Sequence, residues 1–295
     1  MRSTSRIGSA PPGAGGGPNI FARLIGTRLG QALQQTIVYD NKPGANGIIG
    51  NDSVAKSAAV GYTILFSNAS AVVVNPAIQP KLPYRTLKDL VPIAQIGAGG
   101  VLLVTTPDVG DSDMKGLVRY LKANPGRLGY GTWGMGSTGH LSMEALKAKE
   151  GLSISHVPYK TMGQVLTDLQ GGTLQIAFVD ASSPLALIKA GKLVPLGVTG
   201  SHRLPALAGV PTMQEQGYRL GADGWYGLFA PFGTPQAVVQ RLNSEVNRIL
   251  AAPDMRPVLE TWNLSRFPIK TPAEFAQTIR EDLEQWKEIA TTAQV

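Results

Sequence analysis

Glycine and proline constrain this chain more than any other feature of its sequence. There are 35 Gly and 21 Pro among the 295 residues, and they interrupt the chain at short intervals, which keeps its regular elements short. Six apolar runs lie between these interruptions, and their β-branched and aromatic residues are typical of buried strands in mostly parallel sheets. The runs are Thr36 to Tyr39, Tyr62 to Phe66, Gly100 to Val104, Ile154 to Val157, Leu174 to Phe178 and Val194 to Val198.

Segments with helical spacing alternate with these runs. Apolar residues recur with the period of a helix from Ile20 to Leu33 and from Phe275 to Ala290. Pro18 and Asn19 stand where the first of these helices starts, which suits first-turn and capping chemistry. Alternating strands and helices predict an α/β protein with ligands at the carboxyl ends of its strands. The length predicts two domains of moderate size.

The positive charge of the chain does not indicate a nucleic-acid partner. Residues 1 to 160 hold 16 Lys and Arg and 8 Asp and Glu, a net +8, whereas residues 161 to 295 hold 11 and 12, a net −1, which together give the formal +7. No two Lys or Arg are adjacent, and a surface that follows phosphates needs clustered cations among stacking aromatics. We therefore expect no nucleic acid as partner, and only a mild preference for an anionic ligand.

Missing residue types exclude several kinds of chemistry. There is no Cys, which excludes thiol catalysis, disulfides and Cys-ligated metals. The three histidines, His140, His156 and His202, match no common metal pattern, so each is expected to lie in a loop or the core. We expect no metal and no cofactor. No apolar run reaches the roughly 18 residues of a membrane span, and no apolar stretch follows the charged start, so we expect no intact secretory signal in this sequence.

Two glycine-rich loops are candidates for ligand binding. The first runs from Pro11 through Gly16 and Gly17 to Asn19 and leads into a helix. Its backbone amides can approach a ligand, and the helix start favours negative charge, so the loop can hold a carboxylate or phosphate. A flexible loop near the terminus is the alternative interpretation.

The second loop, from Gly131 to His140, allows two interpretations. Gly134, Gly136 and Gly139 have the spacing of a dinucleotide fingerprint, but the acidic residue expected about 20 positions later is missing. Lys160 stands there and could hold a ribose phosphate, which keeps an NADP-dependent enzyme as an alternative. The hydroxyls of Ser137 and Thr138 at a helix start suit a carboxylate equally well.

Asp180 is the remaining candidate from local pattern. It ends the run from Leu174 to Val179, a position favoured for function in α/β proteins. It could instead cap a helix that begins near Ser182. The sequence leaves both roles open.

Longer stretches occur in a fixed order along the chain. They are the first glycine loop with Asn19 to Arg23, Asn41 to Ala45 with Gly47, Val157 to Lys160 with Leu166 to Gly172, Gly191 to Leu193 with Val198 to Gly200, Gly209 to Thr212, and Trp225 to Pro231 with Gly233 to Pro235. From about Pro11 to Ile289 they resemble the Bug family, the extracytoplasmic solute receptors of tripartite tricarboxylate transporters.

The resemblance implies a two-lobed clamshell of the periplasmic binding protein type (type II), with a mixed sheet flanked by helices in each lobe. Lobe 1 is expected to comprise residues 1–101 plus 223–295 and lobe 2 residues 102–222, with the ligand in a cleft that closes by hinge motion. Carried over to this sequence, the ligand-binding residues are Gly16, Gly17, Pro18, Asn19, Ser67, Asn68 and Ala69 in lobe 1, and Ser137, Thr138, Tyr159, Lys160 and Asp180 in lobe 2.

Two features depart from the family pattern, the residues before the first glycines and the loop itself, which with Gly13 to Gly17 is longer than usual. The residues before the first glycines, Arg6 to Ala10, lack the usual apolar strand, so the first strand is expected to be weakened. Trp133 in the second loop either favours a flat or aromatic ligand or packs the loop against the protein.

The resemblance implies a receptor and not an enzyme. We expect a monomeric periplasmic protein, with its signal peptide removed or truncated, that delivers a small carboxylate to membrane transporter subunits. Dicarboxylates, amino acids and aromatic carboxylates are the ligand classes considered. The alternatives are the NADP-dependent oxidoreductase that would use Gly134 to Gly139, and a receptor domain that senses its ligand without a role in transport.

Overall fold

The chain forms two compact units, each with its own sheet. The computed structural model describes residues 4–9, 17–42, 44–110, 112–200, 202–261, 264 and 269–293. Unit 1 comprises Met1–Ala98, Trp225–Leu259 and Leu264–Glu284, and unit 2 comprises Gly99–Gly224, Glu260–Asn263 and Gln285–Val295. The division expected from the sequence placed the residues from Gln285 onward with the first lobe, whereas here they belong to unit 2. Each unit is described by itself below.

The sheet of unit 1 mixes parallel and antiparallel strands in the order β2-β1-β3-β10-β4. Its strands are β1 (Thr4–Ser9), β2 (Thr36–Asn41), β3 (Thr63–Asn68), β4 (Leu90–Gly99) and β10 (Gly224–Pro231). β1 pairs in parallel with β2 and β3, and β10 runs antiparallel to β3.

The expectation of a weakened first strand is wrong. β1 spans six residues and is paired along both edges. Backbone hydrogen bonds to two neighbours define a strand here even though the sequence has no clear apolar run.

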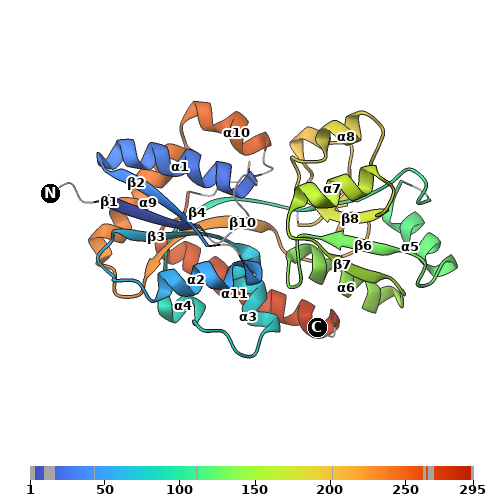
Figure 1. The fold of residues 1–295 in the computed structure, drawn as a ribbon, viewed down its shortest axis with the longest axis horizontal. Coiled ribbons are helices and arrows are strands. Elements are labelled where there is room, and N and C mark those ends of the chain that lie inside the picture. The colour runs from blue at the N-terminus through green and yellow to red at the C-terminus, as the bar shows by residue number, and fades with distance from the viewer. Residues whose placement is uncertain are drawn as a thin grey trace. The chain divides into compact units, whose positions relative to one another are not determined.

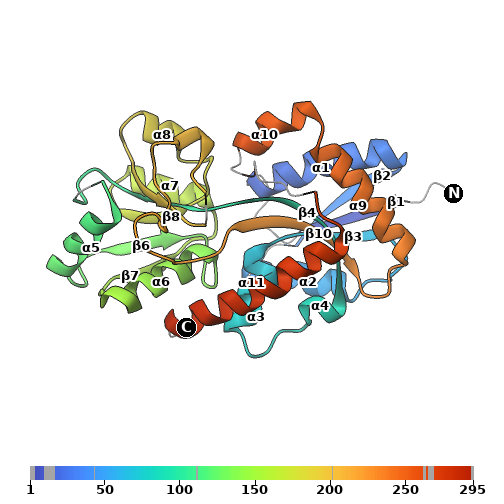
Figure 2. The same ribbon diagram turned by 180° about the vertical axis from the view of Figure 1, so that it is seen from behind.

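Helices cover both faces of this sheet (Figure 1). They are α1 (Gly17–Leu33), α2 (Ile48–Ala55), α3 (Asn75–Ile78), α4 (Thr86–Asp89), α9 (Gln236–Leu250), α10 (Arg256–Thr261) and α11 (Pro272–Ala293), with short turns η1 (Ala45–Gly47), η2 (Ser70–Val74, a π-helix) and η4 (Pro253–Met255). The ends of α10 from Glu260 and of α11 from Gln285 belong to unit 2. α1 packs beside α9 on one face, and α2 lies on the other, as both views show (Figures 1 and 2). α1 buries Phe21, Ile25 and Leu29, one stripe of a helix with period 3.6.

The sheet of unit 2 has the order β7-β6-β8-β5-β9. Its strands are β5 (Leu102–Thr105), β6 (Gly129–Thr132), β7 (Ser155–Pro158), β8 (Ile176–Val179) and β9 (Val194–Val198), and its helices are α5 (Met114–Ala123), α6 (Thr138–Glu150), α7 (Met162–Gln170) and α8 (Leu185–Lys189), with a turn η3 (Pro205–Leu207). β6 is parallel to β7 and β8, whereas β5 is antiparallel to β8 and β9.

Alternate residues of these strands fill two separate cores. Leu103 and Phe178 pack in the core with α5 and α6, whereas their neighbours Leu102, Val104 and Val179 pack in the core with α7 and α8. Side chains alternate between the two faces of a strand, so continuous apolar runs are what a sheet covered on both faces requires.

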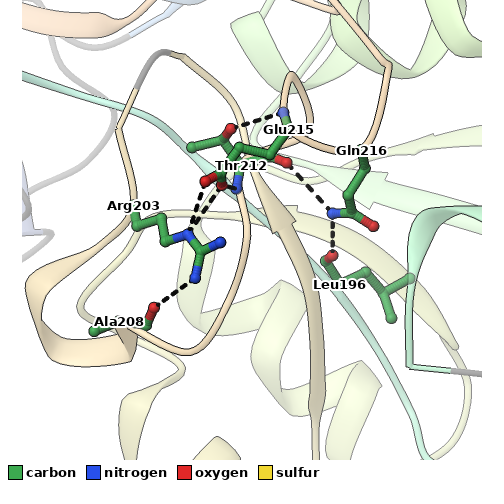
Figure 3. Close-up of polar contacts among 6 residues, drawn as sticks. All are labelled: Leu196, Arg203, Ala208, Thr212, Glu215 and Gln216. Carbon is green, nitrogen blue, oxygen red and sulfur yellow. Dashed lines mark hydrogen bonds and ion pairs between the residues drawn. The ribbon is translucent and has the colours of Figure 1, made fainter.

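The segment from residue 203 to 216 is held by its own polar side chains (Figure 3). Thr212 Oγ1 accepts from the Glu215 amide at 3.1 Å, and a Glu215 carboxylate oxygen accepts from the Thr212 amide at 2.6 Å, the reciprocal pattern of a capping box. Arg203 Nε donates to the same carboxylate at 2.9 Å and lowers the pKa of Glu215. Gln216 Nε2 donates to the carbonyl oxygen of Leu196 on β9. The family-like stretch Gly209 to Thr212 therefore serves the fold of unit 2.

Within the described ranges, no helix is both long enough and apolar enough to cross a membrane.

Candidate functional site

In unit 2, three parallel strands end at one edge of the sheet. Thr132 pairs with Pro158, and Gly131 pairs with Ala177, so β6, β7 and β8 have their carboxyl ends side by side. The loops that follow these strands contain all the lobe 2 candidates: Trp133, Ser137, Thr138, Tyr159, Lys160 and Asp180. We call these six residues the unit 2 edge. Loops at the carboxyl ends of strands are where α/β proteins bind ligands.

Ser137 is the N-cap of α6. Its Oγ accepts a hydrogen bond from the His140 amide at 3.2 Å, and its side chain is buried. Thr138 is the first residue of the helix and is also buried. The first amides of a helix have no partner within the helix and carry the positive end of its dipole. This helix start is therefore suited to a carboxylate.

The side chain of Tyr159 is fixed by a carboxylate. Its hydroxyl donates to Asp168 Oδ2 at 2.7 Å, and burial together with Asp168 raises the pKa of Tyr159 to about 12. The phenol therefore stays neutral. The neighbouring Lys160 is exposed and brings a positive charge to the unit 2 edge.

Asp180 organises the turn before α8. One carboxylate oxygen accepts from the amides of Ser182 and Ser183 at 3.0 and 2.8 Å, and each serine hydroxyl also donates to the carboxylate. The helix itself begins only at Leu185. The capping role predicted for Asp180 is thus present in a turn, not at a helix beginning near Ser182.

Trp133 packs against the core of unit 2 and is half-buried. Its ring edge lies 3.3 Å from the place that a Cβ on Gly139 would occupy, and that Cβ would also lie 2.6 Å from Phe178 Cβ. Gly139 thereby lets α6 approach β8 closely. Of the two roles expected for Trp133, the packing role is the one visible, and ligand contact stays a prediction.

Sequence reasoning missed the relation between two histidines. His140 on α6 and His156 on β7 are buried or half-buried, as expected of core histidines, but their ring centroids lie only 4.3 Å apart. Both rings also bond to the loop between β6 and α6. Nothing in a spacing of 16 residues signals this contact.

In unit 1, β1, β2 and β3 likewise end at one sheet edge, since Ser9 pairs with both Asn41 and Phe66. The candidates near this edge are Gly17, Pro18 and Asn19 in the first turn of α1, and Ser67, Asn68 and Ala69 at the end of β3. Gly16 lies outside the described residues. We call the six described candidates the unit 1 edge.

Asn19 does not cap α1, contrary to the prediction. The helix begins at Gly17, so Asn19 already lies inside it. Its Oδ1 accepts from Arg23 Nε at 2.8 Å, one turn further on. Pairing at this spacing joins side chains on one helix face.

The polar side chains at the end of β3 hold the π-helical turn η2. Ser67 Oγ donates to Asn51 Oδ1 at 2.8 Å, Asn51 Nδ2 donates to the Tyr84 hydroxyl at 3.0 Å, and that hydroxyl donates to the carbonyl oxygen of Ala71 at 2.9 Å. Burial raises the pKa of Tyr84 to about 12. Asn68 Oδ1 accepts from the Ala71 amide. Ser67 and Asn68 thus shape the unit 1 edge through internal bonds.

Tyr226 is a second residue that the sequence did not single out. It pairs with Asn68 across β3 and β10, and its ring stacks on Phe66 with centroids 5.3 Å apart. It is half-buried and lies beside the unit 1 edge. The one sequence feature that pointed to Tyr226 is its place in the family-like stretch from Trp225 to Pro231.

No metal centre is visible among the residues that the structure describes: no group of three or more His, Asp or Glu is placed to hold an ion.

Comparisons with known proteins show the family. Residues 21–294 match the family described as "Tripartite tricarboxylate transporter family receptor". Protein BugT of Bordetella pertussis is 34% identical over 280 residues, which cover 94% of this chain and 84% of BugT. A structure from R. palustris with adipate has a TM-score of 0.90 at 30% identity and covers 98% and 97% of the two chains. MatC from Rhodopseudomonas palustris with bound malate has a TM-score of 0.87 at 28% identity, with 97% and 98% covered.

These findings confirm the fold class and the resemblance inferred from the motifs. Each unit is a mixed sheet flanked by helices, as in periplasmic binding proteins of this type. The family consists of periplasmic solute receptors and not of enzymes, which sets aside the NADP-dependent oxidoreductase. The chain belongs to the tripartite tricarboxylate transporter receptor family, the Bug family of solute-binding proteins.

Proposed function

We propose that this receptor works in the periplasm, where it captures a small carboxylate and delivers it to the membrane subunits of a tripartite transporter. The unit 2 edge is the observation that carries the proposal, because three loops bring a helix start, two hydroxyls and a lysine to one place. The adipate and malate in the two R. palustris structures support dicarboxylates as the first class to test.

Each group at the unit 2 edge has a distinct role in this proposal. The start of α6 offers backbone amides and the helix dipole to the carboxylate. Ser137 accepts from the His140 amide, which leaves its hydroxyl proton for the ligand, since a hydroxyl donates once and accepts twice. Lys160 adds a mobile positive charge. Asp180 and Tyr159 hold their loops through the bonds described above, and they limit the ligands that fit.

The unit 1 edge supports the same class of ligand. The start of α1 at Gly17 is a second helix N-terminus at the end of parallel strands, and such a start favours an anion. Asn68 and Ala69 lead into η2 at the same edge. In the proposal these residues contact the ligand mainly through their backbone, because the side chains of Asn19, Ser67 and Asn68 bond within the unit.

A thermal-shift screen tests the proposal. The panel contains adipate, malate, amino acids and aromatic carboxylates, each beside its neutral amide, with NADPH as a negative control. A ligand at 100 times its Kd adds about 2.7 kcal/mol to the free energy of unfolding. We expect at least one carboxylate to raise Tm while its amide does not. Stabilisation by the amides alone, or no response to any carboxylate, would contradict the proposal.

A further inference from the structure

The rings of two histidines of unit 2, the buried His140 and the half-buried His156, lie tilted against each other near the loop between β6 and α6. His140 is 5% exposed, and its ring centroid lies 4.3 Å from that of His156. The ring of Tyr130 on β6 stacks on the ring of His156, and the two centroids lie 4.9 Å apart. The rings therefore form one cluster that joins α6, β6 and β7.

Both histidines hydrogen-bond to the loop from Thr132 to Ser137, which we call the capping loop. The Gly136 amide donates to His140 Nδ1 at 3.3 Å, so the neutral ring of His140 has its proton on Nε2. His156 Nε2 lies 2.7 Å from Thr132 Oγ1. Thr132 Oγ1 also lies 3.1 Å from the Gly134 carbonyl oxygen, and because the hydroxyl has a single proton, it donates either to that oxygen or to His156 Nε2.

These bonds define the shape of the loop that precedes α6. Thr132 Oγ1 also accepts from the Gly134 amide at 3.2 Å. The Thr132 hydroxyl therefore links His156 to both the amide and the carbonyl group of Gly134. Gly134 and Gly136 have φ values of 130° and 72°, a region in which side chains are rarely tolerated. The backbone of this loop thus has an uncommon conformation, and the side chains of the two histidines hold it through hydrogen bonds.

The charged groups around the pair leave little compensation for a protonated ring. Glu144 and Lys147 face the pair from α6, Tyr130 on β6 faces His156, and the two histidine rings face each other. The Glu144 carboxylate already accepts from the Tyr130 hydroxyl and from Lys147 Nζ at 2.7 Å. Burial lowers the pKa of His140, and burial with the neighbouring His140 lowers the pKa of His156 to about 4.

We propose that His140 and His156 are positioning residues that keep the capping loop in its ligand-binding shape only while both rings are neutral, so that acid weakens ligand binding. A proton on His140 Nδ1 would face the Gly136 amide proton and turn an acceptor into a second donor. A proton on His156 would place a charge against its neighbour in a buried site. The proposal rests on the proposed function, since it makes the unit 2 edge the part that responds to pH.

The direction of the pH effect follows from the lowered pKa values. An unfolded histidine titrates near 6.5, and the folded pair takes up protons only at lower pH. The contribution of the pair to stability is therefore complete above about pH 6.5 and is lost as the pH falls toward about 4. Ligand affinity is expected to fall over the same range.

Substitutions that keep or remove the hydrogen bonds test the positioning role. His140→Leu removes the acceptor for the Gly136 amide, and we expect it to weaken binding of the best carboxylate about tenfold at neutral pH. His140→Asn keeps an acceptor near the position of Nδ1, and we expect affinity within about threefold of the wild type. His202→Leu, at the exposed third histidine of unit 2, is the matched control. Wild-type affinity in His140→Leu would overturn the positioning role.

A double variant isolates the effect of protonating the two histidines on ligand affinity. In His140→Asn/His156→Gln both side chains can still bond to the capping loop, but neither takes up a proton. Affinity is measured by calorimetry as the pH is lowered from 7 toward 4, within the range where circular dichroism shows a folded protein. Protonation of the ligand is the same for both proteins. We expect the wild type to lose about tenfold more affinity than the double variant, and superimposable pH profiles would overturn the switch.

NMR separates failure of this inference from failure of the proposed function. At neutral pH the chemical shifts of the ring nitrogens should show the proton of His140 on Nε2, and acid should shift the Gly136 amide resonance. This result needs no ligand. A proton on His140 Nδ1 at neutral pH would overturn the inference even if carboxylates bind. The expected tautomer together with no carboxylate binding would leave the loop support intact and remove the proposed function.

Discussion

At the scale of single residues, the proposed recognition at the unit 2 edge would depend on caps and turns more than on charge. The sequence predicted a hydroxyl at the start of α6 correctly, because a serine before a helix is a local signal. It could not predict that Asn19 bonds to Arg23 or that the rings of His140 and His156 lie against each other. Those contacts depend on which rotamer or which strand brings the partner, and a pattern of residue types does not specify that.

The cap at Ser137 can be separated from a role in binding. Ser137→Ala removes the bond to the His140 amide, and Asp113→Ala removes the equivalent cap of α5, where Asp113 accepts from the Gly116 amide at 2.6 Å. We expect each to lower the free energy of unfolding by about 1 kcal/mol, measured by urea denaturation. Only Ser137→Ala should also weaken carboxylate binding, by about tenfold, because β5 is antiparallel and α5 begins at the opposite edge of the sheet. Equal affinity in both variants would remove Ser137 from the site.

At the scale of elements, an apolar run located a strand whether that strand is buried, as β8 is, or largely exposed, as β7 is. Each of the six apolar runs overlaps a strand, and β9 matches its run from Val194 to Val198. β1 and β6 were not identified as runs, because glycines and polar residues interrupt their pattern. Both are paired with two neighbours, so tertiary pairing and not local composition defines them. The sequence also predicted too large a share of parallel strand pairs, because β5 and β10 run antiparallel to their neighbours.

The close approach of α6 to its sheet gives a test at this scale. Gly139 and Gly163 are each the second residue of a helix, α6 and α7. A Cβ on Gly139 would lie 2.6 Å from Phe178 Cβ, whereas the nearest atom to one on Gly163 is 4.0 Å away. We expect Gly139→Ala to cost about 1 to 3 kcal/mol in stability through overpacking. Gly163→Ala should instead stabilise the protein by up to about 1 kcal/mol. Similar shifts in Tm for both variants would contradict the close packing.

At the scale of the whole molecule, two units with separate sheets give the fold of a solute receptor, and the family match covers nearly the whole chain. The +7 charge is dispersed and does not mark a surface for nucleic acid. Selection of an anion is assigned to helix starts and hydroxyls at the ends of parallel strands. These features could be placed on loops from the sequence, but their arrangement at a common edge required the strand registers.

Calorimetry with matched ligands tests the central claim most directly. Adipate and malate are titrated into the protein beside adipamide and malamide, which keep the same length and lose the charge. We expect at least one of the carboxylates to bind at least about a hundredfold more tightly than its diamide, because each charge-assisted hydrogen bond contributes about 1.5 to 3 kcal/mol. Equal affinity for the acids and the amides, or binding of the amides alone, would contradict a receptor that selects carboxylates.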